Sequence, residues 1–386
     1  VETPTFLFAM LLVLFVLINP SHADEYKLKQ LATLGTDSSK PELVQAMSNP
    51  LDENQLILAN VNGEISLFDI KRQRSEPIIN PADKKNSSLI SIALHPNFTL
   101  KKEHGYAILY TSHLEPKRIR GRALNQEEES TGDNSQFTER DAVIYEWQFS
   151  VSTNLMPFSA QKREVFRVGV ESTSEGIRHM RFNPHVKPWQ DDYGLMYVSV
   201  NRAFLTQKLD KSSNAILRFR PEKFGLKSYT AVNNGIAQND DSHAAMLIGN
   251  LGRIVYFSWN KQNENHLQIA LDIPPSTILV DVPYGELTPA LTQVKPLFQL
   301  NSSSVSQAFL TYHEKAITQL RHHLLYLIKR NGAWELTALN ASQQTGSVFL
   351  WQLPTDTLSA NGHYSLISDR AGQLMLIDYE NLHLFG

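Results

Sequence analysis

The chain of 386 residues contains no cysteine, and this absence removes several kinds of chemistry. It can form no disulfide, it has no thiol nucleophile, and it offers no thiolate ligand to a metal ion. The fold must therefore be stable through its hydrophobic core alone, and a chain of this length can bury a large one.

An excess of charge of either sign is also missing. The 36 basic residues nearly match the 39 acidic ones, which gives a net charge of −3. Because proteins that bind nucleic acid usually carry a strongly basic face, we expect no nucleic-acid partner.

Several local signatures of catalysis do not occur in the sequence. It has no G-x-S-x-G, no H-E-x-x-H, no P-loop and no G-x-G-x-x-G. A catalytic triad is built in space rather than along the chain, so the missing motifs leave that possibility open.

The N-terminal region differs in composition from the rest. The run Phe6–Ile18 is apolar throughout but short for a membrane span, and Asn19, Pro20 and a Ser-x-Ala sequence ending at Ala23 follow it. This pattern predicts a cleaved signal peptide over residues 1–23 and a periplasmic or secreted domain over 24–386. The alternative is an uncleaved anchor, which is the only membrane contact that the pattern predicts.

Short β-strands separated by tight turns make up most of the remaining sequence. Asn62-Gly63 lies between two strand-like runs, Leu56–Val61 and Glu64–Asp69, and this pair of turn residues is typical of a hairpin. About twenty such runs without a long amphipathic helix indicate an all-β sandwich or propeller. Their regular spacing with no linker favours a single β-propeller.

Two stretches repeat each other. Ser88–Thr111 and Gly176–Asn201 both consist of a strand, a turn with x-Pro, a polar connection ending in Gly, and a second strand. The turn prolines, Pro96 and Pro184, are 88 residues apart. Between the two stretches, residues 114–140 are charged and poor in apolar side chains, which predicts a long polar loop that is either disordered or a lid.

These segments resemble the soluble quinoprotein glucose dehydrogenases and the related aldose or sorbosone dehydrogenases. The best match is Ser88–Phe98 (SLISIALHPNF) followed by His104–Thr111 (HGYAILYT), and Asn214–Phe219 and Gly372–Ile377 match weaker phrases of the family. The resemblance implies a six-bladed β-propeller. It also implies an oxidoreductase that transfers hydride from a sugar hydroxyl to pyrroloquinoline quinone (PQQ).

The catalytic stretch of the family is altered in this chain. Where the family has a histidine base and an aspartate that orients it, the resemblance places Glu175 and Asn201. A buried Glu175 with a raised pKa could act as a base, and His179 could replace it if both lie on one face of a regular strand. The alternatives are a solvated carboxylate and an ordinary polar residue.

The resemblance also implies PQQ and Ca²⁺ as cofactors. Arg178, Arg202 and Arg253 are the candidate partners of the quinone carboxylates, and Asp240 and Asp241 are candidate metal ligands. The alternative for each arginine is a surface charge, and adjacent aspartates on a strand would point in opposite directions.

Three functions remain open from the sequence. The first is an exported PQQ-dependent sugar dehydrogenase. The second is a propeller that has lost catalysis and binds a small sugar, a glycan or a protein partner. The third is a lactonase-type hydrolase with a Ca²⁺ ring to which Glu175 and Asn201 would contribute. Convergence of Glu175, Arg178, His179 and Asn201 at the mouth of the central channel, with an arginine nearby, is the feature that separates these possibilities.

Overall fold

The structure is a computed structural model of the chain. This structure describes residues 29–34, 42–80, 87–117, 139–149, 160–203, 213–222, 245–259, 266–283, 296–301, 305–339, 348–353, 358 and 363–386. The predicted signal peptide, most of the predicted loop 114–140, and Asp240 and Asp241 lie outside these ranges. No helix in the described ranges has the length and apolar character needed to cross a membrane.

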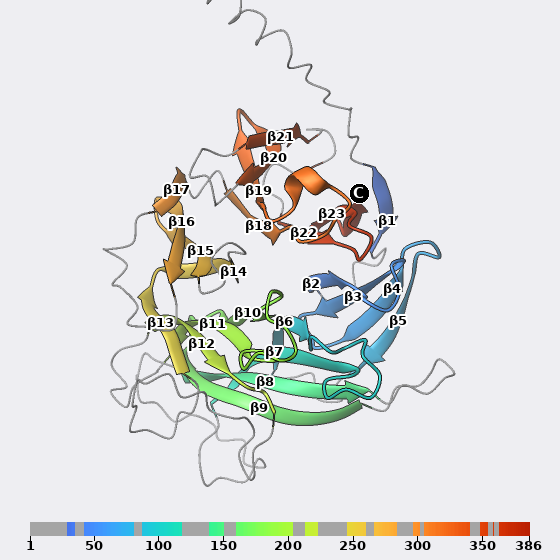
Figure 1. Cartoon of the computed structure of the whole chain (residues 1–386), viewed down its shortest axis with the longest axis vertical. Coiled ribbons are helices and arrows are strands. Elements are labelled where there is room, and N and C mark those ends of the chain that lie inside the picture. Colours follow the sequence, from blue (N-terminus) through green and yellow to red (C-terminus); the bar gives the residue numbers. More distant parts are fainter. Residues whose placement is uncertain are drawn as a thin grey trace, which may run out of the picture.

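Six blades of four antiparallel strands surround a central axis (Figure 1). Four sheets have four strands each, and one sheet of eight strands consists of two blades that share a single pair, Ala203 with Val170. Four blades and two blades make six, so the predicted six-bladed β-propeller is confirmed.

The strands follow the chain from the innermost to the outermost position of each blade. Blades 1 to 3 contain β2 (Leu43–Ser48), β3 (Gln55–Asn60), β4 (Ile65–Asp69), β5 (Arg74–Ile79), β6 (Ser88–Leu94), β7 (Ile108–Pro116), β8 (Glu139–Phe149), β9 (Ala160–Glu171), β10 (Gly176–Phe182), β11 (Met196–Ala203), β12 (Ser213–Phe219) and β13 (Ala245–Leu251). Blades 4 and 5 contain β14 (Arg253–Trp259), β15 (His266–Ile273), β16 (Ser276–Pro283), β17 (Pro296–Asn301), β18 (Val305–Thr311), β19 (Leu324–Arg330), β20 (Ala333–Leu339) and β21 (Val348–Gln352). A 3₁₀ turn, η3 (Thr318–Leu320), lies between β18 and β19.

Blade 6 joins the two ends of the described chain. Its strands are β22 (Tyr364–Ser368), β23 (Leu374–Asp378), β24 (His383–Phe385) and, at the outer edge, β1 (Gln30–Thr33). The β1 strand pairs antiparallel with β24, with Gln30 opposite Phe385 and Thr33 opposite His383. This pairing closes the ring and protects the outer edge of β24.

The predicted hairpins and the internal repeat correspond to defined positions in the blades. Asn62-Gly63 forms the β3–β4 turn, where Gly63 has a φ of +86°. The two repeated stretches are the inner hairpins of blades 2 and 3, β6–β7 and β10–β11. The repeat therefore reflects one structural unit used in successive blades.

One expectation about segment boundaries is wrong. The predicted loop 114–140 begins too early and ends too late, because β7 extends to Pro116 and β8 begins at Glu139, with Pro116 paired to Arg140. The strands β13 and β14 follow one another in sequence but do not form a hairpin, since β13 pairs with β12 of blade 3 and β14 pairs with β15 of blade 4.

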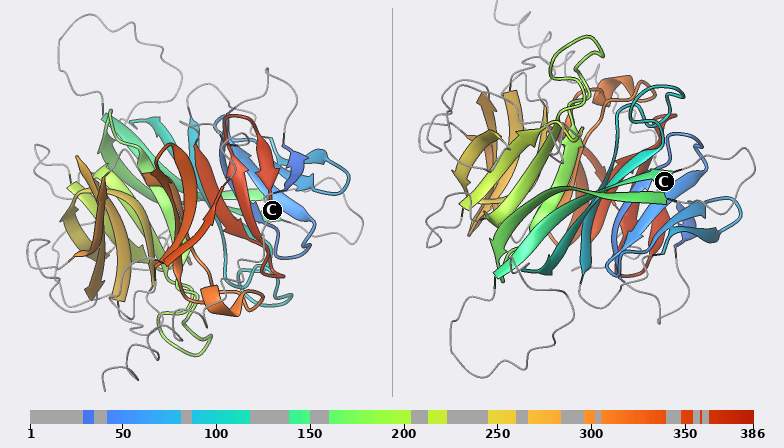
Figure 2. Two further views of the ribbon diagram at one scale, coloured as in Figure 1. Left: turned by 90° about the horizontal axis from the view of Figure 1, so that it is seen from above. Right: turned by 90° about the horizontal axis from the view of Figure 1, so that it is seen from below.

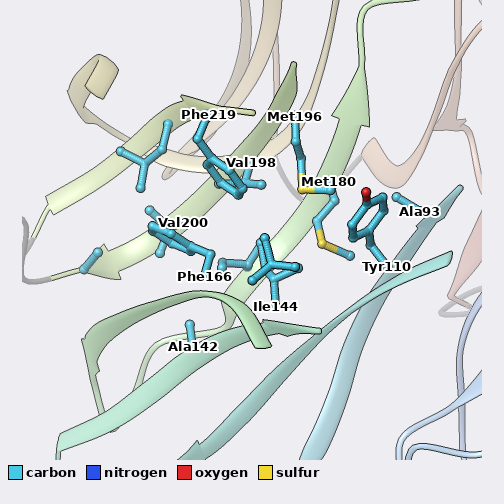
Figure 3. Close-up of a cluster of buried hydrophobic side chains, with 14 of the residues drawn as sticks. Ala93, Tyr110, Ala142, Ile144, Phe166, Met180, Met196, Val198, Val200 and Phe219 are labelled. Carbon is cyan, nitrogen blue, oxygen red and sulfur yellow. The ribbon is translucent and has the colours of Figure 1, made fainter. Parts of the chain in front are cut away.

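Hydrophobic side chains fill the spaces between neighbouring blades. Figure 3 shows the cluster between blades 2 and 3, in which Tyr110, Ile144 and Phe166 pack toward Met180 and Val198. Every one of these five residues is at most 5% exposed. Because both faces of the inner sheets are covered, the strands read as nearly continuous apolar runs.

Candidate functional site

The inner strands of blades 3 and 4 start close together, and the candidate site lies at their starts. Glu175 immediately precedes β10, and Arg253 is the first residue of β14. Asn201 on β11 pairs with Gly176, while Asp272 on β15 pairs with Arg253. The pairing therefore brings residues 78 positions apart in sequence, Glu175 and Arg253, to one end of the barrel of inner strands.

A local turn fixes the direction of Glu175. The buried hydroxyl of Ser174 accepts a hydrogen bond from the Gly176 amide at 3.0 Å and donates one to the Asn201 carbonyl. Gly176 has a φ of +69°, and a Cβ there would lie 2.9 Å from Leu114 Cδ2. Both the backbone conformation and the space require glycine, so the turn holds Glu175 in place.

Glu175 and Arg253 form a bidentate ion pair. Arg253 Nε donates to both carboxylate oxygens at 3.1 Å, and Nη2 donates to Oε1 at 2.6 Å. The second face of the same guanidinium reaches Asp272, with Nη1 donating to Oδ2 at 3.2 Å. Two parallel donors on one carboxylate are the strongest arrangement that arginine offers.

Two further side chains complete the cluster around Glu175. Arg178 Nη1 lies 3.2 Å from Oε1, and the Asn201 amide donates to Oε2 at 3.3 Å. The side-chain Oδ1 of Asn201 accepts a hydrogen bond from the Ile254 backbone amide at 3.3 Å, which fixes the orientation of this side chain. The predicted convergence is thus present for Glu175, Arg178, Asn201 and Arg253, and the side chains of Glu175, Arg178 and Arg253 remain about one third exposed.

The cluster makes Glu175 a weak base. Burial alone would raise its pKa, but hydrogen bonds from Arg253 and the charges of Arg178 and Arg253 outweigh burial and lower it. A general base needs a pKa near the working pH, and a carboxylate held by two guanidinium groups has the opposite shift. The condition under which Glu175 could act as a base, a pKa raised by burial, is therefore not met.

His179 does not share a strand face with Glu175 as a regular strand would predict. The β10–β11 register shifts between Ile177 and His179, and the imidazole packs edge-on against Tyr256 and Phe257 at 6.3 Å. Its Nε2 atom is buried, and burial followed by the charges of Arg181 and Arg178 lowers its pKa well below 6.5.

Arg202 is the predicted cofactor residue that stays outside the cluster. Its guanidinium lies 3.3 Å from Glu171 Oε2 and donates to Thr173 Oγ1 at 2.6 Å, and its side chain is 55% exposed. This position is that of a surface charge rather than of a ligand-binding group.

Arginine supplies all the charge on the inner strands. The described strands β2, β6, β10, β14, β18 and β22 contain Arg178, Arg181 and Arg253 and no aspartate or glutamate. Glu175, at the edge, is shared by two of these arginines. The inner surface of the propeller is therefore positively charged around blades 3 and 4.

Arg181 is the residue that the sequence analysis missed. Its guanidinium carbon lies 4.4 Å above the Tyr256 ring and 5.9 Å from that of Phe257, and within the described chain it has no carboxylate partner. Its aromatic neighbours come from the next blade, so local sequence around β10 gives no signal for it. The runs that form the inner strands contain no acidic residue, and this absence could have indicated that Arg181 has no carboxylate partner on these strands.

Tyr379 on blade 6 is influenced by Arg178. Burial raises the pKa of Tyr379, while hydrogen bonds with Ser365 and the Ala46 backbone and then the positive charge of Arg178 oppose that rise. Blade 6 lies across the ring from blade 3 (Figure 1). The Tyr379 hydroxyl donates to Ser365 Oγ at 2.9 Å, so polar groups of opposite blades face one another near the axis.

The described residues fit the implied cofactors only in part. Guanidinium groups suited to the carboxylates of PQQ are present, whereas the pKa values of Glu175 and His179, the two candidate bases, are both lowered. Within the described ranges, no group of three or more histidine, aspartate or glutamate side chains is arranged to hold a metal ion.

Comparison with known proteins gives the fold. No protein-family profile and no curated protein sequence matches the chain. A crystal structure of a glucose dehydrogenase is 14% identical with a TM-score of 0.61, over 93% of this chain and 98% of that one. The apo-form of the soluble aldose sugar dehydrogenase from Escherichia coli is 14% identical with a TM-score of 0.57, over 93% and 97%. The chain therefore has the propeller fold of the glucose and aldose sugar dehydrogenases.

Proposed function

We propose that this propeller binds an acidic carbohydrate along the inner strands β10 and β14, from Glu175 to Arg181, and does not oxidise it. One observation carries the proposal: the described inner strands bear three arginines and no carboxylate, Glu175 and Asp272 beside them pair with Arg178 and Arg253, and Arg181 has no carboxylate partner within the described chain. In this arrangement the pKa of Glu175 is lowered, which makes it a weak base, and positive charge remains for an anionic ligand.

The polar groups of the cluster suit a sugar. Glu175, Asn201 and Arg253 present planar groups with donors and acceptors in fixed directions, and vicinal hydroxyls pair well with such groups. Because the network already holds them, binding costs little side-chain entropy. The fold resemblance to proteins named as sugar dehydrogenases supports a carbohydrate ligand by analogy.

The positive charge selects an acidic sugar. Arg181 is partly buried beside Tyr256 and has no carboxylate partner within the described chain. An uncompensated guanidinium in such a place is costly unless a ligand supplies the anion. A uronic acid carries both the hydroxyls and the carboxylate that this set of side chains would satisfy.

Calorimetric titration tests the proposal. The full chain is titrated with a short oligogalacturonide and with a neutral oligosaccharide of equal length. We expect binding of the acidic ligand only, weakened about tenfold or more in Arg181→Leu and unchanged in Arg202→Leu, whose side chain lies outside the cluster. Equal binding of the two ligands, or equal effects of the two substitutions, would contradict the proposal.

The predicted PQQ-dependent dehydrogenase remains the second candidate, because the same arginines could pair with the quinone carboxylates. It is distinguished by turnover. A loaded enzyme that reduces a dye only when a sugar is added would favour it over a binding protein. The proposed lactonase-type site has no supporting observation beyond the proximity of Glu175 and Asn201.

A further inference from the structure

One face of the propeller is formed by the loops that join the first and second strands of each blade. We call it the inner-hairpin face; its described loops are residues 49–54, 95–107, 183–195, 312–323 and 369–373. Side-chain contacts connect these loops around the ring. Tyr193 bonds to Asn97, the Tyr312 hydroxyl donates to the Gly372 carbonyl at 2.7 Å, and Arg370 reaches the Pro50 carbonyl at 3.5 Å.

Exposed apolar side chains concentrate on this face. Among the described residues, four large hydrophobic side chains are exposed: Leu51 (54%), Leu100 (46%), Trp189 (80%) and Ile273 (39%). Leu51, Leu100 and Trp189 lie in inner-hairpin loops of three consecutive blades, whereas Ile273 ends β15 at the opposite face. Both views of Figure 2 place the green β10–β11 loop and the orange 312–323 segment on the same side of the ring.

Trp189 is held outward by a rigid turn. The Gln190 amide donates to the Lys187 carbonyl at 2.9 Å, and the Lys187 amide donates to Gln190 Oε1 at 2.5 Å. Arg220 clamps the following residues by donating to the Tyr193 and Asp191 carbonyls at 2.7 and 2.5 Å. Pro188 and Trp189 are therefore the central residues of a closed turn, and the Trp189 side chain is exposed there.

The chain enters the propeller at the same face. The β1 strand runs antiparallel to β24, which runs antiparallel to β23, so Gln30 lies at the edge where the β22–β23 loop turns. The Lys29 amide donates to the Gly386 carbonyl at 3.0 Å, and a Cβ on Gly386 would lie 2.8 Å from Gln373 of that loop. The apolar run Phe6–Ile18 is thus joined to the fold on the inner-hairpin face.

We propose that the inner-hairpin face rests on a lipid bilayer, with Trp189, Leu100 and Leu51 in the interface between headgroups and acyl chains. Tryptophan favours this depth because one end of its ring system is apolar and its N–H can bond to water or headgroups. Eleven residues separate Ile18 from Gln30, and they span at most about 40 Å when extended. When the apolar run is retained and lies in a membrane, this connection keeps the bilayer close to the same face.

The charges on the inner-hairpin face nearly cancel, so we expect an apolar rather than an electrostatic contact with the bilayer. The described inner-hairpin loops carry six lysine or arginine and seven aspartate or glutamate residues. Binding should therefore change little with salt or with the fraction of anionic lipid, in contrast to polybasic surfaces.

Tryptophan emission with brominated lipid tests the proposal on the full chain. Trp147, Trp259 and Trp334 are each at most 9% exposed, so Trp189 is the accessible one among the tryptophans whose side chains are described. Vesicles of brominated phosphatidylcholine should quench an emission component that is missing from Trp189→Phe. Trp189→Ala should lower partitioning into unbrominated vesicles by roughly tenfold, while Ile273→Ala, the matched substitution on the opposite face, should leave it unchanged.

Three outcomes would overturn the proposal. Bound protein whose Trp189 emission is not quenched would show that the N-terminal run alone holds the membrane. Equal losses in Trp189→Ala and Ile273→Ala would remove the assignment to one face. A dimer that forms without vesicles and dissociates in Trp189→Ala would make a second copy of the chain the occupant. Because the side chains of Trp189 and Ile273 are exposed, Trp189→Ala and Ile273→Ala should leave the melting temperature unchanged. A lowered melting temperature would identify a misfolded variant.

Discussion

The carboxylate of Glu175 accepts three hydrogen bonds from the guanidinium of Arg253, a residue of the neighbouring blade. This pair links the starts of two inner strands and occupies the position at which the family resemblance implies a catalytic base. The pKa of Glu175 is lowered, because hydrogen bonds from Arg253 and the charges of Arg178 and Arg253 stabilise the ionised carboxylate and outweigh burial.

Removing the charge of Glu175 should strengthen anion binding. Glu175→Gln keeps the shape of the side chain but frees Arg178 and Arg253 from their shared carboxylate. The proposed function predicts that an oligogalacturonide binds this variant several-fold more tightly, measured by calorimetry at constant ionic strength. Weaker binding would mean that Glu175 contacts the ligand more than it competes with it.

Two buried histidines should make the protein less stable in mild acid. Burial, followed by the charge of His104, lowers the pKa of His95 to about 4, and burial followed by the charge of Lys162 lowers that of His113 to about 3. Both side chains are at most 6% exposed. The unfolded chain, with histidine pKa values near 6.5, binds more protons than the native state below that pH.

Stability is therefore fully present above about pH 6.5 and falls as the pH drops toward 4. At pH 5 each histidine should cost about 2 kcal/mol, which chemical denaturation at a series of pH values measures. His113→Gln should reduce the number of protons taken up on unfolding by about one, which makes the free energy of unfolding depend less steeply on pH. An unchanged slope in that variant would contradict the assignment of His113 as a neutral buried group.

Gly105 should tolerate no side chain. It has a φ of +98°, and a Cβ there would lie 1.8 Å from Nδ1 of His95, which accepts the Asn97 amide at 3.0 Å. Gly105→Ala should lower the free energy of unfolding by about 3 kcal/mol or more. Gly332 is the matched control, because its φ is +84° but nothing lies within 4 Å of its Cβ position, so Gly332→Ala should cost only about 1–2 kcal/mol. Equal losses in the two variants would show that contact with His95 is unimportant.

Arg167 should be essential for the stability of blade 2. Its guanidinium contacts Asp141 at 2.8 Å, Glu164 at 2.9 Å and Glu115 at 3.0 Å, and its side chain is 19% exposed. Arg167→Met would leave three carboxylates close together, and we expect a loss of about 3–5 kcal/mol in urea unfolding. Arg202→Met removes an exposed pair with Glu171 and should cost less than about 1 kcal/mol. A loss at Arg167 no larger than that at Arg202 would contradict this account.

The sequence allows the blades to be predicted better than their assembly. Asn62-Gly63 identifies a hairpin because the turn needs a residue with positive φ, and the prolines Pro96 and Pro184 identify the same loop in two blades. The pairing of β1 with β24 joins residues about 350 positions apart, and no local pattern encodes it. Similarly, β13 and β14 follow one another in sequence but belong to different blades.

The candidate site could be predicted as a set of residues but not as a network. The family resemblance identifies Glu175 and Asn201, and charge identifies Arg178 and Arg253. The protonation state of Glu175 depends on an arginine 78 residues away, so it requires the fold. The β-bulge in β10 redirects His179, and sequence periodicity alone assumes a regular strand.

The most direct test of the central claim is a dye-coupled oxidation assay on the full chain after incubation with PQQ and Ca²⁺. Glucose and galacturonate are supplied in turn, and the reaction without sugar is the control. The account predicts no sugar-dependent dye reduction by this chain, even where the quinone or the acidic sugar binds. Sugar-dependent reduction that Glu175→Gln abolishes would contradict it, because the carboxylate would then act as the base.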